Sequence, residues 1–378
     1  ETEPGTQRRQ NRQLSRFFAT LCPRVFWRRL AVVVVKSLKG LQPRLMEISR
    51  VSGVVVIFTR RDFTLGAAAI GATSLVAAPS DASASAYPDR NVTYVIGFNP
   101  GGESDSTARM QQDYFQQITG KSLVILNRPG AGGATAWAQF GKLKPDGHIV
   151  ISTIVPHTIL QPAMKDVGYV TEDIDTVYFF HYTPDAIFVR ADSPFKTLAD
   201  FIDAARNSAR GVVTVGGSGT NSANHLAATI LTGLTGAAMS YVPFKGSAPT
   251  VAALLNGAVT AAMSYTTQGV KAGEQVRVLG IATQERHPAL PDVLTFREAG
   301  IDHIGGAYRG VAVPKGTPDP VRRRLSDIIG EINAIPAFQK KMLDAGYSLI
   351  DIPVDAVPDF IAERRAAYAD AIAVLKAS

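Results

Sequence analysis

The chain has 378 residues, 46% of them hydrophobic and 19% charged, and a formal net charge of +7. This length and hydrophobicity suit one large or two medium α/β lobes with ordinary cores, so a largely disordered chain is not expected. Residues 1–61 hold 13 Lys and Arg against 3 Asp and Glu, whereas the chain from Tyr87 onward holds 26 against 27. The body is therefore balanced in charge and carries no basic stripe interleaved with aromatic residues. We expect no nucleic-acid partner.

The first 86 residues have the order of an export leader. Arg60 and Arg61 precede a weakly apolar stretch at residues 66–78, and small residues with an A-x-A pattern follow at 82–86. The paired arginines resemble a twin-arginine signal. A membrane anchor would need about 20 apolar residues, and this stretch is shorter and contains Gly, Ser and Thr. We predict that residues 1–86 are removed and that the mature protein is exported, with the twin-arginine pathway as the candidate route.

Cysteine and histidine usage predicts neither a metal nor a cofactor. Cys22 is the only cysteine and lies in the leader, so the body has no disulfide, no thiol chemistry and no cysteine-based metal site. The six histidines show no metal-ligand spacing.

Short β-type runs alternate with amphipathic runs along the body, which is the pattern of parallel sheets covered by helices. The predicted strands are residues 92–97, 123–127, 148–153, 186–190, 212–215 and 276–282. The predicted helices are residues 106–119, 133–142, 198–207, 222–232, 251–256 (just after Pro249), 319–333, 336–345 and 357–375. In the helix at 198–207, Leu198, Phe201, Ile202 and Ala205 follow helical spacing, which predicts one buried face.

Two tight segments, near residues 191–194 and 301–306, predict crossings between two lobes. The first lobe is then discontinuous. We expect residues 87–190 to form its first part, residues 191–304 to form the second lobe, and residues 305–378 to complete the first lobe with the C-terminal helices.

Three Gly-rich turns, at residues 97–105, 127–133 and 216–222, each join a predicted strand to a helix. Glycine lets the backbone approach a ligand, and the N–H groups of a first helical turn point at the same place. Because open α/β sheets bind ligands at the carboxyl ends of their strands, the three turns predict an anion site. The alternative for the first turn is an ordinary tight turn with Ser104 or Asp105 as helix N-cap.

The anion is predicted to be a carboxylate rather than a phosphate. No turn matches a phosphate-binding glycine motif, and none contains lysine. Ser218 does not match a nucleophile elbow because Thr220 stands where a glycine is required. No catalytic set is evident, so we predict a binding protein that is not an enzyme.

The ordered motifs resemble the Bug family, the periplasmic receptors of tripartite tricarboxylate transporters. The resemblance covers nearly all of residues 87–350. Its motifs are Phe98-x-Pro100-Gly101-Gly102-x-x-Asp105-x-x-Ala108-Arg109, Asn127-Arg128-Pro129-Gly130-Ala131-Gly132-Gly133, Gly217-Ser218-Gly219-Thr220-Asn221 with His225-Leu226-Ala227, Val242-Pro243-Phe244-Lys245-Gly246, Leu290-Pro291-Asp292-Val293 with Glu298-Ala299-Gly300, and Val313-Pro314-Lys315-Gly316-Thr317-Pro318.

The resemblance implies a type II periplasmic-binding-protein fold, in which two α/β lobes enclose a ligand cleft. It implies that the first and third turns bind the carboxylate of a small organic acid from opposite lobes. It also implies membrane permease subunits as partners. Two other functions on this fold stay open, an exported sensor and a carboxylate-processing enzyme.

We expect Asp105 to cap its helix beside the site, because a carboxylate next to a bound carboxylate would repel it. The predicted ligand-binding residues are Phe98, Asn99, Gly101, Gly102, His157, Thr158, Ser218, Gly219, Thr220 and Asn221.

Overall fold

The computed structural model describes residues 87–377, so the predicted leader lies outside the described residues. The strands of the described part are β1 (Val92–Ile96), β2 (Leu123–Asn127), β3 (Ile149–Val155), β4 (Ile174–Arg190), β5 (Val213–Gly217), β6 (Met239–Pro243), β7 (Ala261–Tyr265), β8 (Val276–Ile281), β9 (Gly306–Pro314) and β10 (Ser348–Pro353). Its α-helices are α3 (Glu103–Thr119), α4 (Ala134–Phe140), α5 (His157–Met164), α6 (Leu198–Arg206), α7 (Ala223–Thr235), α8 (Ser247–Leu255), α9 (Thr266–Ala272), α10 (Asp319–Ala334), α11 (Pro336–Asp344) and α12 (Val357–Ala377).

The strands form one hydrogen-bonded path in the order β2-β1-β3-β9-β4-β7-β5-β6, and β8 and β10 also pair with β4. The outer strands are parallel: β1 pairs in this way with β2 and β3, and β5 with β6 and β7. The central strands β4 and β9 are antiparallel to all their neighbours. The prediction of parallel sheets is therefore right for the flanks and wrong for the centre, where long strands return directly beside one another.

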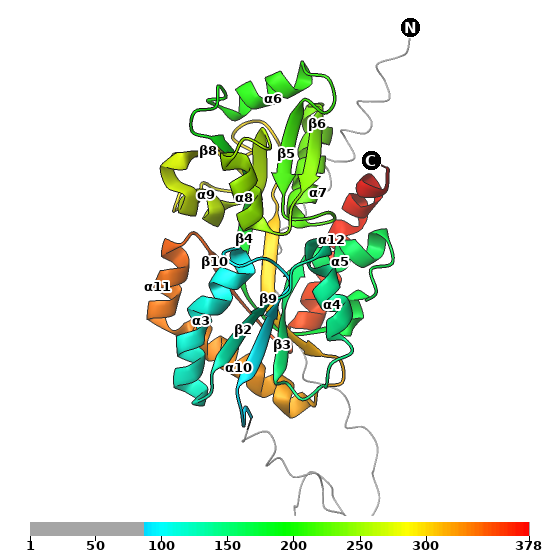
Figure 1. Ribbon diagram of the computed structural model, residues 1–378, viewed down its shortest axis with the longest axis vertical. Coiled ribbons are helices and arrows are strands. Elements are labelled where there is room, and N and C mark those ends of the chain that lie inside the picture. The colour runs from blue at the N-terminus through cyan, green and yellow to red at the C-terminus, as the bar shows by residue number, and fades with distance from the viewer. Residues whose placement is uncertain (1–86, 378) are drawn as a thin grey trace, which may run out of the picture. The chain divides into compact units, whose positions relative to one another are not determined.

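Strand β4 belongs to two halves of the molecule. Its first part, up to Pro184, pairs with β9, and its last part, from Asp185, pairs with β7 and β8. We call β1–β3, β9, β10 and the first part of β4 the first half, and β5–β8 with the last part of β4 the second half. In Figure 1 the second half, with α6 and α8, lies above the first half, with α3 and α10.

The chain crosses between the halves inside β4, so the crossing predicted near residues 191–194 is misplaced. A strand that continues through both halves gives no turn signal at the crossing. The chain returns to the first half just before β9 begins. There the amide of Asp185 donates to Gly305 O at 2.9 Å, and the amide of Gly305 donates to Ala282 O at 3.1 Å.

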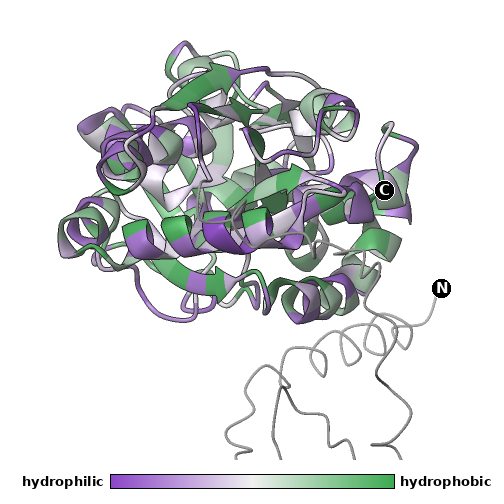
Figure 2. Ribbon diagram, turned by 90° about the horizontal axis from the view of Figure 1, so that it is seen from below, coloured by the Kyte–Doolittle hydropathy of each residue, from purple (hydrophilic) through white to green (hydrophobic). Residues whose placement is uncertain are grey.

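Each half has its own apolar core, and Figure 2 shows the hydrophobic strands inside and more hydrophilic faces on the helices around them. The helix α6 illustrates why the sequence folds in this way. Its buried residues are Leu198, Phe201, Ile202 and Ala205, as the spacing predicts. Thr197 and Asp200 form a capping box that fixes its first turn.

Several elements differ from the sequence prediction. Helix α3 begins at Glu103 rather than Ser106, and α8 begins at Ser247, before Pro249. Proline is tolerated in a first helical turn, where its missing N–H costs nothing. The prediction omitted α5, α9, β6, β7, β9 and β10. Among the described helices, none combines the length and apolarity needed to cross a bilayer.

Candidate functional site

The three Gly-rich turns meet where the two halves join. A Cβ added to Gly219 would lie 2.8 Å from Gly132 Cα, and one added to Gly97 would lie 3.1 Å from Gly133 Cα. The φ angles of Gly132 and Gly219 are +63° and +113°, a region that disfavours side chains. Backbone from separate halves therefore packs directly together, which only glycine at these positions permits.

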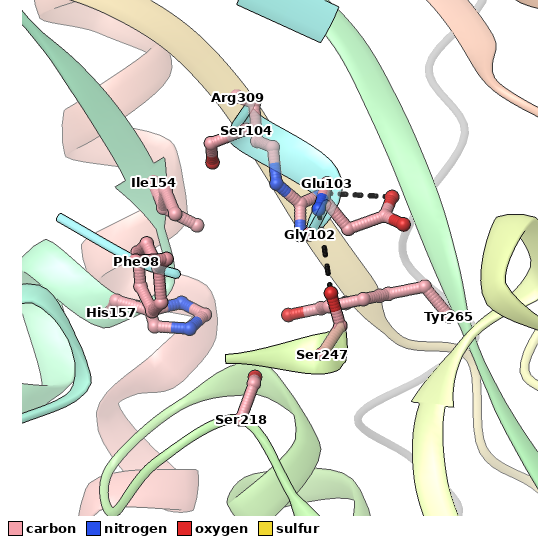
Figure 3. A pocket seen from close by; sticks show the side chains of 10 residues that line it. All are labelled: Phe98, Gly102, Glu103, Ser104, Ile154, His157, Ser218, Ser247, Tyr265 and Arg309. Atoms are coloured by element: carbon pink, nitrogen blue, oxygen red, sulfur yellow. Dashed lines mark hydrogen bonds and ion pairs between the residues drawn. The ribbon is translucent and has the colours of Figure 1, made fainter. Parts of the chain in front are cut away.

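A narrow pocket lies at this junction, with free space of about 10 Å³, roughly what one water molecule needs. Figure 3 shows Phe98, Ile154 and His157 on one side and Tyr265 on the other. The lining residues are Phe98, Gly102, Glu103, Ser104, Ile154, His157, Ser218, Ser247, Tyr265 and Arg309. Both halves contribute to this set, and the free space is too small for a ligand of several carbon atoms.

Four of the ten predicted ligand-binding residues line this pocket: Phe98, Gly102, His157 and Ser218. The other six are Asn99, Gly101, Thr158, Gly219, Thr220 and Asn221, and they lie outside the lining. Gly219 packs on the second turn, and Thr220 is exposed. Thr158 was expected at the mouth of the cleft but lines a different pocket, with its hydroxyl donating to Ile154 O at 3.1 Å.

The backbone amides of the turns are mostly paired within the chain. The amide of Asn99 donates to Lys245 O, that of Glu103 to Ser247 Oγ, and that of Asn221 to His225 Nδ1. The amides of Gly101, Ser218 and Gly219 also have acceptors in the chain. The sequence suggested that such amides would bind the carboxylate, and in this conformation these six do not.

Asp105 is not the N-cap of α3, because the helix starts three residues earlier than predicted, with Gly102 as its cap. The Asp105 carboxylate instead accepts the amide of Gly101 at 2.9 Å, the Asn127 side chain at 3.0 Å and the Arg109 guanidinium. Burial raises the pKa of Asp105, but these hydrogen bonds outweigh it and leave the pKa lowered. Asp105 therefore holds the first turn in shape by these hydrogen bonds, and the prediction that it caps the helix is wrong.

Two buried side chains of opposite charge, Glu103 and Arg309, lie in the pocket lining, each only 3% exposed. Arg309 Nη1 is 3.9 Å from Glu103 Oε2, which is longer than a hydrogen bond. Arg309 donates to Thr183 Oγ1 at 2.9 Å, and its guanidinium lies 4.4 Å from the centre of the Tyr265 ring. Arg309 Nε and Glu103 Oε2 have no hydrogen-bond partner.

Two further lining residues carry unpartnered polar atoms. The hydroxyl of Tyr265 and the Nδ1 atom of His157 are buried without a hydrogen bond. Burial raises the pKa of Tyr265, so the phenol stays protonated. Burial, and secondarily the charge of Arg309, lowers the pKa of His157 to about 3, so its ring is neutral near pH 7. Buried polar groups are nearly always paired in proteins, so four unpaired atoms around one small space make this pocket the candidate site.

Ser218 connects the pocket to the crossing strand. Its hydroxyl donates to Asn224 Oδ1 at 2.5 Å, and Asn224 Nδ2 donates to Asp185 Oδ1 at 2.7 Å. Burial raises the pKa of Asp185 to about 7, against the lowering effects of Asn224 and Arg309. A buried hydrogen-bonded chain therefore runs from the pocket wall to the point where β4 changes halves.

Six lining residues were missed by the sequence analysis: Glu103, Ser104, Ile154, Ser247, Tyr265 and Arg309. For some of these residues the sequence contained a signal that could have identified them. Glu103 and Ser104 lie inside the first Gly-rich turn, and Ser247 directly follows Gly246 of a quoted motif. Arg309 is a single charge within an apolar run that the structure shows to be β9. Tyr265 gave no comparable signal.

A second, larger pocket of about 640 Å³ lies between β4, α5, α10 and α12. Its charged residues are paired: Arg322 Nη2 is 2.8 Å from Asp175 Oδ1, and Arg365 pairs with Glu172. Within residues 87–377 no group of three or more His, Cys, Asp or Glu side chains is arranged to hold a metal ion.

A family model and a sequence relative both place the chain among transporter receptors. Residues 107–375 match the family model described as tripartite tricarboxylate transporter family receptor. The chain is 32% identical to the protein BugT of Bordetella pertussis over 299 residues, covering 76% of this chain and 88% of BugT.

Two solved structures from Rhodopseudomonas palustris are similar throughout the body. MatC, solved with bound malate, has a TM-score of 0.71 at 26% identity, covering 76% of this chain and all of MatC. A second protein, solved with adipate, has a TM-score of 0.72 at 26% identity, covering 76% of this chain and 98% of its own. The fold is thus the predicted α/β periplasmic-binding-protein fold, and the resemblance seen in the sequence is confirmed. The chain belongs to the TctC, or Bug, family of tripartite tricarboxylate transporter receptors.

Proposed function

We propose that this receptor captures a small organic carboxylate in the narrow pocket between its halves and delivers it to the membrane subunits of a tripartite tricarboxylate-type transporter. The observation that carries the proposal is the set of unpartnered donors in the pocket wall, Arg309 Nε and the Tyr265 hydroxyl. A guanidinium and a phenol in a dry site suit a carboxylate. The malate and adipate in the two related structures support the same class of ligand.

Membership of this family makes the chain a solute-binding receptor and not an enzyme. Receptors of the family are periplasmic binding proteins. For export we propose the leader at residues 1–86, with Arg60 and Arg61 as a twin-arginine signal. Replacing both arginines by lysine should leave the protein in the cytoplasm. Unchanged recovery from the periplasm would show that the twin-arginine route is not used.

We propose that the two halves act as lobes that open and close about β4 and β9. Closure would bring Ser218 and Tyr265 from one half against Phe98 and Arg309 from the other. A ligand that contacts both halves stabilises the closed state by its difference in affinity for the two states. The residues we propose as ligand contacts are Phe98, Gly102, His157 and Ser218, with Tyr265 and Arg309 added from the structure.

The test is a thermal-shift screen of the purified full chain against a panel of C3 to C6 mono-, di- and tricarboxylates and amino acids. A ligand at 100 times its Kd should add about 2.7 kcal/mol of stability. Arg309→Lys should lose the shift, because lysine cannot reproduce the planar donor fork. The matched control Arg365→Lys, in the larger pocket, should keep it. A flat response of the wild-type protein across the whole panel would contradict the proposal.

A further inference from the structure

Helix α9 of the second half contacts two separate segments of the first half. On one side, the Thr267 hydroxyl and Gln268 Nε2 both donate to Glu103 Oε1 at the start of α3, the latter at 2.7 Å. On the other side, the Thr266 hydroxyl donates at 3.4 Å to the carbonyl oxygen of Gly346, which lies between α11 and β10. Figure 1 shows α9 at the edge of the second half, above α11 and α3. The contacts of α9 therefore join the two halves.

Helix α9 is itself fixed to the second half. It begins directly after Tyr265, the last residue of β7, and β8 follows it after a short 3₁₀ turn. A Cβ added to Gly269 of α9 would lie 2.8 Å from Val278 Cγ2 on β8, so the helix packs closely on that strand. A motion that separates the halves would therefore carry α9 away from Glu103.

The bonds between α9 and Glu103 are strong ones. Glu103 is only 3% exposed, and a buried carboxylate is costly unless it is hydrogen-bonded. Thr267 and Gln268 donate to this charged group, and such bonds exceed those between neutral groups. Arg309, whose Nη1 lies 3.9 Å from Glu103 Oε2, is on β9 of the first half, so its charge stays beside Glu103 in any such motion. Separation of the halves thus removes the bonds from α9 and keeps the counter-charge.

We infer that Glu103, Thr267 and Gln268 form a latch that holds the two halves together whether or not a ligand is bound. The inference rests on the proposed movement of the halves and goes beyond it. The latch consists of groups of the chain alone, so it stabilises the closed form, with α9 against Glu103, before any ligand arrives. Lys271 Nζ adds a solvent-exposed contact at the same edge, donating to Gly101 O at 3.1 Å. A ligand then binds a receptor whose closed form is already populated.

The latch can be broken from the second half alone. Thr267→Val and Gln268→Met remove the two donors and leave side chains of similar size. In the closed form of the double variant, Glu103 Oε1 is buried without these donors, whereas in the open form water hydrates it. The changes therefore raise the free energy of the closed form only. We expect the ratio of open to closed form to rise about 10-fold for each lost bond and about 100-fold for both.

The experiment is a pulsed electron-spin measurement of the distance between two nitroxide labels, one on each half, without ligand. The full chain carries Cys22→Ser, because Cys22 is its only cysteine. The labels are attached through Gln117→Cys on α3 and Ala199→Cys on α6, both at exposed positions. The chain with an intact latch should show mainly the short distance of the closed form. The double variant Thr267→Val, Gln268→Met should show mainly a longer distance.

The matched control changes the same two residue types away from the contact between the halves. Thr214→Val and Gln275→Met remove hydrogen bonds that lie within the second half, from Thr214 to Thr260 and from Gln275 Nε2 to Ala272 O. This control should keep the distance distribution of the chain with the intact latch. A shift in the control equal to that of the double variant would overturn the inference.

Two further results would overturn it. One is a chain with an intact latch that shows the long distance alone. The other is a double variant that keeps the short distance. If the double variant does not fold, as judged by circular dichroism, Thr267→Val alone is measured, with an expected shift of about 10-fold and the same results against it. These measurements use no ligand, so a flat carboxylate screen would contradict the proposed function and leave the distances unaffected.

Discussion

The two pockets of this receptor differ in a way that is informative about binding sites. The pocket beside α12 is large, about 640 Å³, whereas the pocket between the halves has about 10 Å³ of free space. The large pocket contains two ion pairs, Arg322 with Asp175 and Arg365 with Glu172, and one buried atom without a hydrogen-bond partner, Arg322 Nε. The small pocket contains Arg309 and Glu103 with unpaired atoms. Because four such atoms surround the small pocket and one lies in the large pocket, we propose the small pocket as the ligand site despite its smaller volume.

Closure explains why the better candidate is the smaller space. A receptor that encloses its ligand brings its two walls together, and we propose that the small space is the closed form of this cleft. The larger pocket is lined by elements of the first half alone and by α12, so it does not change when the halves move. Matched substitutions in the two pockets, or in groups next to them, should therefore have different effects.

The largest effect is expected for Arg309→Met. This change leaves the carboxylate of Glu103 buried without a counter-charge, which costs about 3 to 5 kcal/mol in comparable buried pairs. The matched change Arg365→Met, at a half-exposed ion pair in the larger pocket, should cost no more than about 1 kcal/mol. Urea unfolding of both variants measures the difference. Equal losses of unfolding free energy would show that Arg309 does not compensate the buried charge of Glu103.

Asp185, behind the small pocket, should give a pH dependence of unusual sign. Its pKa in the folded protein is raised to about 7, against about 3.9 in an unfolded chain. The folded state therefore holds the proton more tightly, and the stabilisation is complete below pH 4 and is lost as the pH rises to 7.

Relative to Asp185→Asn, the wild-type protein should lose about 1.4 kcal/mol of unfolding free energy for each pH unit in that window.

Glu172, in the larger pocket, is the matched group. Partial burial raises its pKa, but the hydrogen bond and charge of Arg365 outweigh burial and leave the pKa lowered. Its stabilisation is present at neutral pH and is lost as the pH falls. Unfolding curves for Asp185→Asn and Glu172→Gln across pH 4 to 8 should therefore deviate from wild type in opposite directions; deviations of the same sign would refute the difference between the pockets.

A smaller effect is expected where the glycine turns touch. Gly219→Ala places a Cβ 2.8 Å from Gly132 Cα, on rigid backbone of the other half. The control Gly316→Ala has a similar positive φ of +89° but open space around it. Both variants bear the strain of that backbone conformation, so the comparison isolates the clash. Gly219→Ala should be about 1 to 3 kcal/mol less stable than the control and should lose the ligand-induced thermal shift. Equal stability and an intact shift would show that the turns do not need to touch.

The sequence predicted most of what local patterns determine. The buried face of α6 follows from the spacing of Leu198, Phe201, Ile202 and Ala205, and the apolar runs of β1 and β2 mark those strands within one residue. Strand β4 was predicted only at residues 186–190, because polar residues such as Asp175, His181 and Asp185 interrupt its earlier part. The strand partners of Asp175 and His181 lie on β9 and β10, and that of Asp185 lies on β7, all far along the chain.

The site was less predictable than the fold for the same reason. The Gly-rich turns indicated where the halves meet, and they do meet there. The identity of the charged pair could not be derived, because Arg309 reaches Glu103 and Thr183 only after β9 has been placed beside β4. Contacts of such long sequence separation leave no periodic signal. The turns therefore located the pocket, and the tertiary pairing determined its chemistry.

The most direct test of the account is a crystal structure of the receptor grown with the carboxylate that gives the largest thermal shift. We expect electron density for that ligand between the halves, with its carboxylate in contact with Arg309 and Tyr265 and close to Ser218. Density for the ligand in the pocket beside α12, with the space between the halves still filled by protein side chains, would contradict it.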